Sequence, residues 1–501
     1  MTDGSGKSTR AMKRVSLTIA SGLALAASCP TGARAGGFEE PGIGVEAMGR
    51  GGAFAAKADD GTALEYNIAG LARQRGTRVQ LDAKLSIDHF QFERSGSYSG
   101  TKDSDASQPW LGQAYPKLQS NPIGLAPFIA VSTDFNHFDR WTFAIGLNTP
   151  SSAAANRQWP STVNGGWPAP NRYDATGVNL LVVYPMLAAA VRVTHWLDVG
   201  LALQMVYGHF DLHSTAYGDL GTSPTPENHQ LDVPLHITTS GFSATGVLGL
   251  MFHPVDGLTF AANLRGPMQI DSSGSLTAIP AGTLPALDPG TAANPAKAKL
   301  QFHLPWVARF GVRYAFKDAK RREKGDIELD GTYETWNEAE GGGDTLTSKS
   351  VGPYAINTQI THHYKDTGSV RLGGAYNFWF ENATMLSLRA GVFYDSAATS
   401  DKWSRTDFNT LAKVGYTVGI GYKVRGVGIN GAYNFISSSD RVTANGRQQI
   451  INGLGGTTSG PDGTPEPVYN NGKYSARTHV LFLGFTFNTD EIKRKNRVVR
   501  Y

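Results

Sequence analysis

Charged side chains occur on one face of several alternating segments. The arginines among them are the residues best suited to binding an acidic ligand. Strand alternation places four arginines on the inward face of their segments: Arg309, Arg313, Arg371 and Arg389. Residues two apart in a strand point to the same face, and a guanidinium holds a carboxylate through two parallel hydrogen bonds. Glu328, Asp330 and Glu334 fall on the same predicted face. The arginines therefore either form structural ion pairs with neighbouring strands or bind a ligand carboxylate.

The sequence lacks the linear motifs of common hydrolases. It has no Gly-x-Ser-x-Gly turn for a nucleophilic serine and no His-Glu-x-x-His helix for a catalytic metal. His362-His363 lies in a long predicted loop without clustered partners, so we expect it to be solvated. We predict no catalytic residue, no metal site and no cofactor. A lipase with a dispersed Ser/His pair is the enzymatic alternative, because such a site leaves no linear trace.

The elements that carry these charges are alternating segments of about ten residues, the length of a membrane-spanning strand. Leu201 and Leu203, for example, alternate with Ala202 and Gln204. Such alternation is typical of a strand with one apolar and one polar or small face. Fourteen segments are predicted, at residues 77–94, 124–136, 141–148, 180–193, 197–210, 241–253, 258–270, 305–316, 325–336, 369–380, 385–395, 415–424, 426–436 and 479–487.

The connections between these segments alternate in length. Long ones are predicted at 95–123, 149–179, 211–240, 271–304, 337–368, 396–414 and 437–478, with short turns such as 137–140 and 254–257 between them. Long loops on one side and short turns on the other indicate an outer-membrane barrel. A soluble β-sandwich also alternates, but it would rarely need seven long loops. We predict an all-β fold, a transmembrane antiparallel β-barrel of about fourteen strands over residues 77–487.

Aromatic residues at the segment ends are expected to form the girdles at the two membrane surfaces. They are Trp196, Tyr314, Trp336, Trp379, Tyr394 and Tyr422. Closure of the sheet is a physical requirement, because lipid cannot hydrogen-bond to unpaired backbone groups.

The N-terminus reads as a secretory signal peptide over residues 1–35. Basic residues precede an apolar run from Val15 to Ala27, and Ala33-Arg34-Ala35 supplies small residues for cleavage. Its removal takes five of the 46 Lys and Arg and one of the 42 Asp and Glu, which leaves 41 of each. A neutral mature chain gives no reason to expect a nucleic-acid partner. Cys29 leaves with the signal, so disulfides are not expected to stabilise the product.

Residues 36–76 do not alternate and are rich in small residues, which is consistent with short helices. A barrel of fourteen strands is wide enough to need filling. We therefore predict that this segment is an N-terminal hatch in the lumen.

The segment and several barrel positions resemble the FadL/TodX family of outer-membrane transporters for long-chain fatty acids and aromatic hydrocarbons. The similarity covers essentially the whole mature chain. In the hatch it rests on Gly37-Phe38, Ala47–Arg50, Ala58–Asp60 and Asn67–Leu71. Weaker matches follow at Leu147–Pro150, Leu304-Pro305, Leu329–Trp336, Lys365–Thr367 and Leu388–Gly391. One departure is Ile68, which replaces the family's hatch proline and keeps the backbone donor that proline removes.

The resemblance implies uptake of hydrophobic small molecules, most of all long-chain fatty acids. Ligand would be captured among the extracellular loops, bound in the lumen and released sideways beside the third strand at Asn148, Thr149 and Pro150. For capture we favour Trp159-Pro160, Trp167–Pro170 and Ile279–Leu287, unless these apolar loops pack on one another as a lid. The lumenal candidates carried over by position are Phe38, Asn67, Ile68 and Ala69.

Two other functions remain as alternatives to fatty-acid uptake. One is a channel for aromatic hydrocarbons, and the other is a general diffusion porin, against which the small-residue hatch argues. We expect a monomer in contact with outer-membrane lipid and lipopolysaccharide of a Gram-negative cell. The basic tail at 488–501 follows the last strand, which is predicted to end at the aromatic Phe487.

Overall fold

The structure is a computed structural model that describes residues 42–98, 108–149, 156–217, 229–279, 287–337, 344–352, 354–360, 362–381, 384–408, 410–448 and 468–489. The predicted signal peptide, Phe38, Pro150 and the tail beyond Thr489 lie outside these residues. Among the described residues, no helix has both the length and the apolar character needed to cross a membrane.

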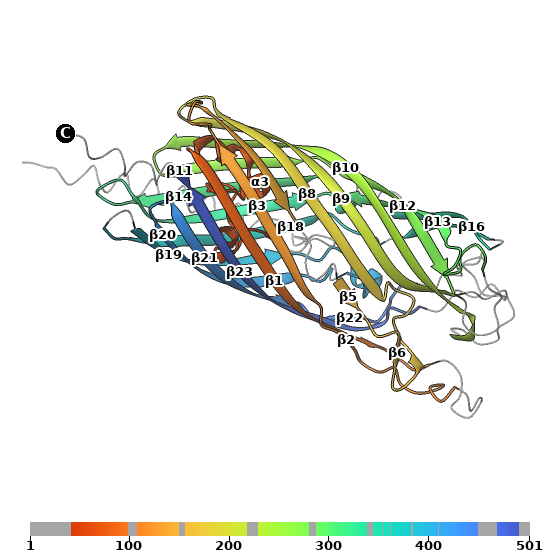
Figure 1. The fold of residues 1–501 in the computed structure, drawn as a ribbon. Helices are drawn as coiled ribbons and strands as arrows, with labels where there is room; N and C mark the ends of the chain where they lie inside the picture. Colours follow the sequence, from red (N-terminus) through yellow and green to blue (C-terminus); the bar gives the residue numbers. More distant parts are fainter. Residues whose placement is uncertain are drawn as a thin grey trace, which may run out of the picture.

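Fourteen antiparallel strands form a closed barrel (Figure 1). Around the wall they are β1 (Thr77–Arg94), β3 (Ile123–Thr133), β4 (Trp141–Asn148), β8 (Gly177–Arg192), β9 (Leu197–Tyr217), β10 (Asp232–Val255), β11 (Leu258–Arg265), β14 (Val307–Lys317), β15 (Glu323–Glu334), β18 (Thr367–Trp379), β19 (Thr384–Asp395), β20 (Lys413–Val424), β21 (Val427–Ser438) and β23 (Gly472–Asn488). The wall closes where β1 pairs with β23, from Arg78 opposite Asn488 to Arg94 opposite Gly472. The predicted all-β barrel of about fourteen strands is confirmed.

The two faces of each strand meet different surroundings. On β9, Leu201 and Leu203 are 61% and 48% exposed, whereas Ala202 and Gln204 between them are buried. Outward leucines exposed in this way would be unfavourable in water, and in a bilayer they face hydrocarbon. The alternation therefore assigns the outward face to lipid and the inward face to the lumen.

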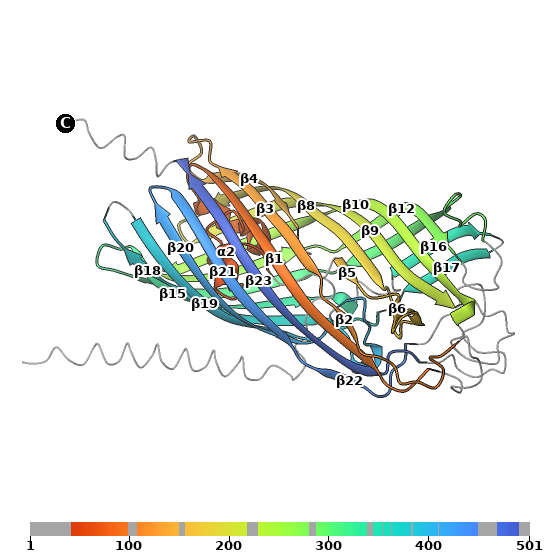
Figure 2. The same cartoon turned by 60° about the horizontal axis from the view of Figure 1, so that its bottom comes forward.

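Several predicted long loops contain strands that extend the wall at the loop end of the barrel (Figure 2). The loop-side half of β10 pairs with β12 (Met268–Ala278), β12 pairs with β13 (Ala296–Leu304), and β13 pairs with β16 (Asp344–Val351). β16 pairs in turn with β17 (Tyr354–Ile360). The predicted loops 211–240, 271–304 and 337–368 were therefore too long. Their outward positions are polar and give no apolar outer face, because this part of the wall lies beyond the hydrocarbon.

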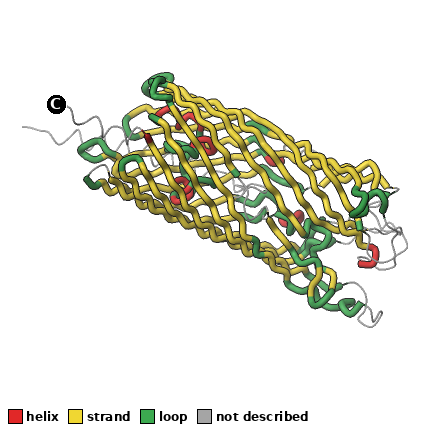
Figure 3. The backbone as a smooth tube through the Cα atoms, in the orientation of Figure 1, coloured by secondary structure: helices red, strands yellow, loops and turns green. Residues whose placement is uncertain are grey.

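Shorter strands and 3₁₀ turns complete the loop end of the molecule. They are β2 (Leu118–Ser120), β5 (Asn156–Gln158), the β6–β7 pair (Thr162–Val163 and Trp167–Pro168), β22 (Arg441–Thr443), η2 (His229–Leu231) and η3 (Asp401–Trp403). Figure 3 shows that loops and turns gather mainly at this end, and that strands make up most of the wall.

Four of the six predicted girdle residues are exposed, whereas Trp379 is half-buried and its indole nitrogen donates to the carbonyl of Glu323 at 2.7 Å. Trp196, Tyr314, Tyr394 and Tyr422 are exposed at the outer face. Trp336 is 1% exposed and its indole nitrogen donates to Glu334, so its assignment to a girdle was wrong. Trp336 follows the end of β15, where the chain turns inward, and strand alternation no longer fixes the direction of its side chain.

Residues 42–76, named here the lumenal segment, lie inside the barrel. They form α2 (Val45–Gly49), α3 (Ala63–Tyr66) and η1 (Ile68–Arg73) (Figure 1). α2 contacts β19, β20 and β21, while η1 contacts β8, β9 and β10. The segment thus touches opposite parts of the wall.

Small residues allow this close fit between segment and wall. A Cβ added to Gly373 would lie 1.9 Å from the carbonyl oxygen of Arg50, and one added to Gly200 would lie 2.5 Å from the carbonyl carbon of Ile68. Both distances are far below van der Waals contact. Glycine at these wall positions is therefore required by the approach of the segment backbone.

Candidate lumenal binding site

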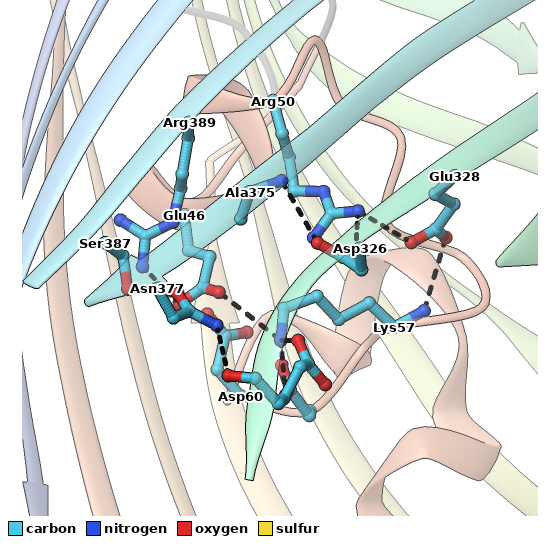
Figure 4. A network of polar contacts seen from close by, with 12 residues as sticks. Glu46, Arg50, Lys57, Asp60, Asp326, Glu328, Ala375, Asn377, Ser387 and Arg389 are labelled. Atoms are coloured by element: carbon cyan, nitrogen blue, oxygen red, sulfur yellow. Dashed lines mark hydrogen bonds and ion pairs between the residues drawn. The ribbon is translucent and has the colours of Figure 1, made fainter. Parts of the chain in front are cut away.

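The lumenal segment is fixed to one side of the barrel by buried charges (Figure 4). Arg50 is fully buried, and its guanidinium donates to Asp326 at 2.7 Å and to Glu328 at 3.2 Å. Glu328 also accepts from the backbone nitrogens of Ala56 at 2.6 Å and Lys57 at 3.2 Å. Carboxylates on β15 thus satisfy both the side chain and the exposed backbone donors of the segment.

The next carboxylate on β15 has the same role. Asp330 accepts from the backbone nitrogens of Phe54 at 2.7 Å and Ala55 at 2.8 Å. The prediction that Glu328 and Asp330 point into the lumen is confirmed. Their principal partners are backbone groups of the lumenal segment, which strand alternation does not reveal.

The predicted hatch residues form a tight turn against the wall. The Asn67 side chain accepts from Ala69 N at 3.0 Å and donates to the carbonyl of Leu250 at 3.0 Å. Ile68 uses the backbone donor that a proline would lack, because its nitrogen donates to Asn263 Oδ1 at 3.4 Å. All three predicted residues, Asn67, Ile68 and Ala69, are fully buried between the segment and β10–β11.

The four predicted arginines point inward, and each of them is ion-paired. Arg309 pairs with Glu65 at 2.5 Å, and Arg389 pairs with Glu46 at 3.0 Å. Both partners belong to the lumenal segment. The remaining two arginines pair with strand carboxylates, Arg313 with Glu323 at 2.5 Å and Asp326 at 2.6 Å, and Arg371 with Asp395 at 3.0 Å. This pairing favours the structural alternative for these arginines.

Beyond the lumenal segment, toward the loops, the inner face of the wall becomes apolar. We call this surface the apolar lumen wall. Its residues are buried, alternate with outward residues along five strands, and belong to one packed cluster. They are Val178, Leu180, Val182 and Tyr184 on β8, Val206 and Phe210 on β9, Val233 and Ile237 on β10, Met268, Ile270, Leu276 and Ala278 on β12, and Ala296, Ala298, Leu300, Phe302 and Leu304 on β13.

One cation lies where the apolar lumen wall meets the lumenal segment. Arg265 is buried at the end of β11, two residues beyond Asn263, which contacts Ile68. Its guanidinium carbon lies 5.9 Å from the ring centre of Tyr184, a residue of the apolar lumen wall. Sequence reasoning did not single out Arg265, although it lies within the predicted segment 258–270, because only the three-dimensional order of segment and wall places it at this boundary.

The loops form a packed cap over the lumen. Trp159 is 5% exposed, lies 5.4 Å from Phe90 between ring centres, and donates from its indole to the carbonyl of Thr406 at 3.0 Å. Trp167 is half-buried and stands 6.0 Å from Tyr98. Of the third predicted stretch, Ile279 is exposed, Leu287 is buried, and 280–286 lies outside the described residues. The two tryptophans thus pack within the cap.

Polar groups connect distant loops within this cap. Asp174 accepts from the backbone nitrogen of Thr406 at 2.7 Å and pairs with Arg405 at 3.2 Å. Arg405 also pairs with Asp407 at 2.7 Å, and Asp407 lies 3.2 Å from His362. His362 is 4% exposed, so its expected solvation was wrong. Its partner is 45 residues away, a separation that hides the contact in the sequence.

The third strand ends early and leaves part of the wall with fewer partners. β4 stops at Asn148, opposite Tyr184 on β8. Beyond that point β3 continues over Ile123–Phe128 and pairs with β1, and within the described residues no strand pairs with its other edge. The Asn148 amide donates to Glu65 of the lumenal segment at 2.9 Å, and Thr149 donates to the carbonyl of Pro127 at 3.0 Å.

A second irregularity interrupts the pairing between the seventh and eighth strands of the wall, β11 and β14. Pairing of β11 with β14 ends at Arg265–Val307, and pairing of β12 with β13 begins at Met268–Leu304. A cavity of about 290 Å³ lies at this break, lined by Pro267, Met268, Gln269, His303, Leu304, Pro305, Trp306 and Thr335. Proline cannot donate to a strand ladder, which accounts for a break at these positions.

The turn end of the lumen is polar. A cavity of about 160 Å³ lies beside the lumenal segment there. Charged residues in its lining include Glu46, Lys57, Asp59, Asp60, Arg78, Arg389 and Lys423. The interior therefore changes from apolar at the loop end to charged at the turn end.

Comparisons with known proteins agree with this architecture. The chain is similar to the solved structure of a FadL homologue from Pseudomonas aeruginosa, with 17% identity, a TM-score of 0.71, and coverage of 90% of this chain and 100% of that one. It is also similar to the toluene transporter TbuX of Ralstonia pickettii, with 15% identity, a TM-score of 0.60, and coverage of 89% and 98%. The toluene transporter TodX of P. putida gives 16% identity, a TM-score of 0.58, and coverage of 89% and 98%.

At these identities the structural likeness establishes the fold alone. No curated protein matches the chain. The model of the family described as outer membrane protein transport protein (OMPP1/FadL/TodX) matches residues 26–462. This match spans most of the chain. The closed barrel with its apolar outer face is the architecture expected of an outer-membrane protein. The chain therefore belongs to the OMPP1/FadL/TodX family of outer-membrane proteins that transport hydrophobic compounds.

Proposed function

We propose that the protein takes up long-chain fatty acids, binding the acyl chain along the apolar lumen wall and releasing it sideways through the barrel. The apolar lumen wall is the observation that carries this proposal. On β8 alone it runs from Val178 to Tyr184, which at ~3.3 Å per residue is roughly 20 Å of apolar side chains. Loop residues of the same cluster, such as Trp336 and Phe408, cover these side chains and have to move for a chain to bind. A surface of that length suits an extended aliphatic chain better than a single aromatic ring.

Arg265 is the cation we assign to the fatty-acid carboxylate. It lies at the floor of the apolar lumen wall, beside Tyr184. A carboxylate in this position gains a charge-assisted hydrogen bond, while its chain stays on the apolar surface. Arg309 and Arg389 contact Glu65 and Glu46 of the lumenal segment rather than the apolar lumen wall.

The charged turn end of the lumen supports lateral release rather than release along the axis. An apolar chain gains nothing from a passage lined by Lys57, Asp59 and Asp60, whose charges must stay solvated or paired. The edge of β3 beyond Asn148 offers a direct route to lipid. The lumenal segment reaches this edge through the hydrogen bond between Glu65 and Asn148, so we propose that the segment is a hatch whose movement opens the gap.

The second break in the wall is the weaker candidate for the exit. Its lining residues Met268 and Leu304 belong to the apolar lumen wall. However, none of the hydrogen bonds that the described residues show connects the lumenal segment to this lining. Binding at the hatch would therefore have no direct contact through which to open it.

The first experiment identifies the ligand. Protein extracted gently from outer membranes is analysed by mass spectrometry for bound hydrophobic molecules, and the emptied protein is titrated with a fatty acid, the alcohol of equal chain length and a monoaromatic. We expect fatty acid to be retained and to bind more tightly than the alcohol. Tighter binding of the monoaromatic would favour the aromatic hydrocarbon channel instead.

Two substitutions separate the chain site from the carboxylate site. Ile270→Asn places an amide in the apolar lumen wall and should weaken both acid and alcohol at least tenfold, with Ile270→Val as the matched control. Arg265→Gln should weaken the acid at least tenfold and leave the alcohol nearly unchanged. Equal loss of acid and alcohol in Arg265→Gln would show that this arginine does not bind the carboxylate.

A further inference from the structure

Three side chains of types that can bind a metal ion lie outside the lumen, on the outer face of the β9–β10 hairpin, although no metal site is predicted from the sequence. Asp211 and His213 are two residues apart on β9 and share a face, and His236 stands directly opposite His213 on β10. The nitrogen and oxygen atoms that these three residues offer all lie within 4.8 Å of one another. The uptake route proposed above does not use them.

The position of the cluster keeps it in contact with water. On β9 it continues the outward series of Leu201, Leu203 and Met205 toward the loop end. The aromatic pair Tyr207 and Phe242, with ring centres 4.9 Å apart, lies between these leucines and the cluster. Aromatic residues gather at the membrane surface, so the cluster lies beyond the hydrocarbon. The side chains of His213 and His236 are 49% and 44% exposed.

The donor atoms of the three side chains are close enough together to share one ion. The two imidazole rings are stacked, with centres 4.1 Å apart and planes 10° from parallel. The Nε2 atoms of His236 and His213 lie 2.8 Å and 3.5 Å from the same Asp211 oxygen, Oδ1. Around a tetrahedral Zn²⁺ with bonds of about 2.0–2.1 Å, neighbouring ligand atoms are roughly 3.3–3.4 Å apart.

We propose that Asp211, His213 and His236 bind a divalent transition-metal ion, with Zn²⁺ as the best match. Two imidazoles and one carboxylate supply three ligands, and the exposed face leaves the fourth position to water. To bind the same ion, the two imidazoles must rotate about their side-chain bonds out of the stacked arrangement, so that both Nε2 atoms point at the metal. Because the ligands come from both strands, the ion fastens β9 to β10 above the membrane surface.

The test uses the full-length mature barrel in detergent, stripped of metal and titrated with Zn²⁺ alone. We expect one equivalent to bind by calorimetry and to raise the melting temperature of the barrel. His236→Ala and Asp211→Asn should each weaken the affinity at least tenfold. His209→Ala is the matched control, because His209 lies on the same face and bonds to Ser240 at 2.8 Å, outside the cluster; it should keep the affinity.

Two outcomes overturn the proposal. One is the absence of Zn²⁺ binding to the unmodified barrel, and the other is equal affinity in the cluster variants and the control. Anomalous scattering at the zinc edge gives an independent position for the ion, expected between β9 and β10. Metal-free melting temperatures of all variants confirm that they are folded. Fatty-acid binding is measured in the same variants and should be unchanged. A failure of the metal-site proposal is therefore distinguishable from a failure of the proposed fatty-acid uptake.

Discussion

At the scale of single residues, Arg50 illustrates how the lumenal segment is held. Its guanidinium is fully buried and pairs with Asp326 and Glu328 on β15. Removing one partner of such a pair leaves buried charge without compensation, which costs about 3–5 kcal/mol. The penalty falls on the attachment between segment and wall. The pair therefore acts as an anchor even if it adds little net stability over a well-packed apolar contact.

We predict that Arg50→Ala lowers the free energy of unfolding of the barrel by about 3–5 kcal/mol. Urea unfolding in lipid vesicles measures this quantity. Arg321→Ala is the matched control, because Arg321 pairs with Asp256 in an exposed turn, where ion pairs contribute little. The same stability for both variants would show that the buried cluster is not an anchor.

A second prediction concerns Asp407 in the cap. Burial alone would raise the pKa of this carboxyl, but Arg405 and His362 outweigh burial and hold the pKa below its ordinary value. The unfolded chain has a pKa of about 3.9, so ionised Asp407 stabilises the cap above roughly pH 4, and this stabilisation is lost as the pH falls further. On the other side of Arg405, burial raises the pKa of Asp174, whose contribution has the opposite sign.

We therefore expect proteases to cleave the loops of Asp407→Asn at pH 7, where the unmodified cap is protected. An acid-stable protease should cleave the unmodified loops only below about pH 4. Mass spectrometry of the fragments identifies the cleaved loops. Thr443→Ala, elsewhere in the same cap, controls for general loosening. Protection of Asp407→Asn equal to that of the unmodified protein at pH 7 would contradict the role given to this carboxylate.

The direction of single residues was largely predictable, whereas their partners were not. Strand alternation correctly placed Arg309, Arg313, Arg371 and Arg389 in the lumen. It could not show that Glu46 and Glu65 of the lumenal segment neutralise two of them, because those contacts span hundreds of residues. The prediction that His362 is solvated was wrong for the same reason, since its burial depends on a loop folded back over the lumen.

At the scale of elements, the early end of β4 is the place where we propose that the ligand leaves the barrel. By the registers of β3–β4 and β4–β8, Leu125 on β3 faces Leu181 on β8 across the place where β4 would continue. Their separation corresponds to two strand spacings, roughly 10 Å. Both side chains point outward, at 67% and 48% exposure. A linker between them would lie across the proposed exit.

We predict that a bis-maleimide linker of that length between Leu125→Cys and Leu181→Cys blocks uptake of a labelled fatty acid in cells. Binding to the purified protein should persist, because the lumen is untouched. The control pair is Leu372→Cys and Tyr416→Cys, equally spaced across the intact strand β19. Normal uptake after complete cross-linking at β3–β8 would place the exit elsewhere, with the break at Pro267 and Pro305 as the next position to test.

The strands themselves were predictable because lipid and lumen impose opposite demands on alternate residues. All fourteen predicted wall segments correspond to observed strands. Where the wall rises above the hydrocarbon this demand disappears, and β12, β13, β16 and β17 were accordingly taken for loops. The predicted seventh segment, 258–270, is divided between β11 and β12 at Gly266-Pro267. The division was not predicted because a local backbone break leaves the alternation of the flanking residues intact.

At the scale of the whole molecule, polarity changes along the barrel axis. The loop end is lined by the apolar lumen wall, whereas the turn end holds the lumenal segment and its paired charges. A water-filled pore requires a polar lumen along its full length, which this interior does not provide. Under the proposed function, an apolar molecule binds above the floor that the lumenal segment forms, and this floor has to move for passage.

Removal of residues 36–76 tests this division of roles directly. The segment occupies the lumen from β8–β10 across to β19–β21, so the barrel without it should contain a continuous path for water. We predict that the intact protein conducts few ions in planar bilayers and that the deleted form conducts them readily. High conductance of the intact protein would favour the diffusion porin, whereas low conductance of the deleted form would show that the cap closes the barrel.

We expect the deleted barrel to fold, because the wall glycines that receive the segment, such as Gly200 and Gly373, form their strand pairs without it. Its resistance to unfolding by detergent on unheated gels verifies this before the conductance is interpreted.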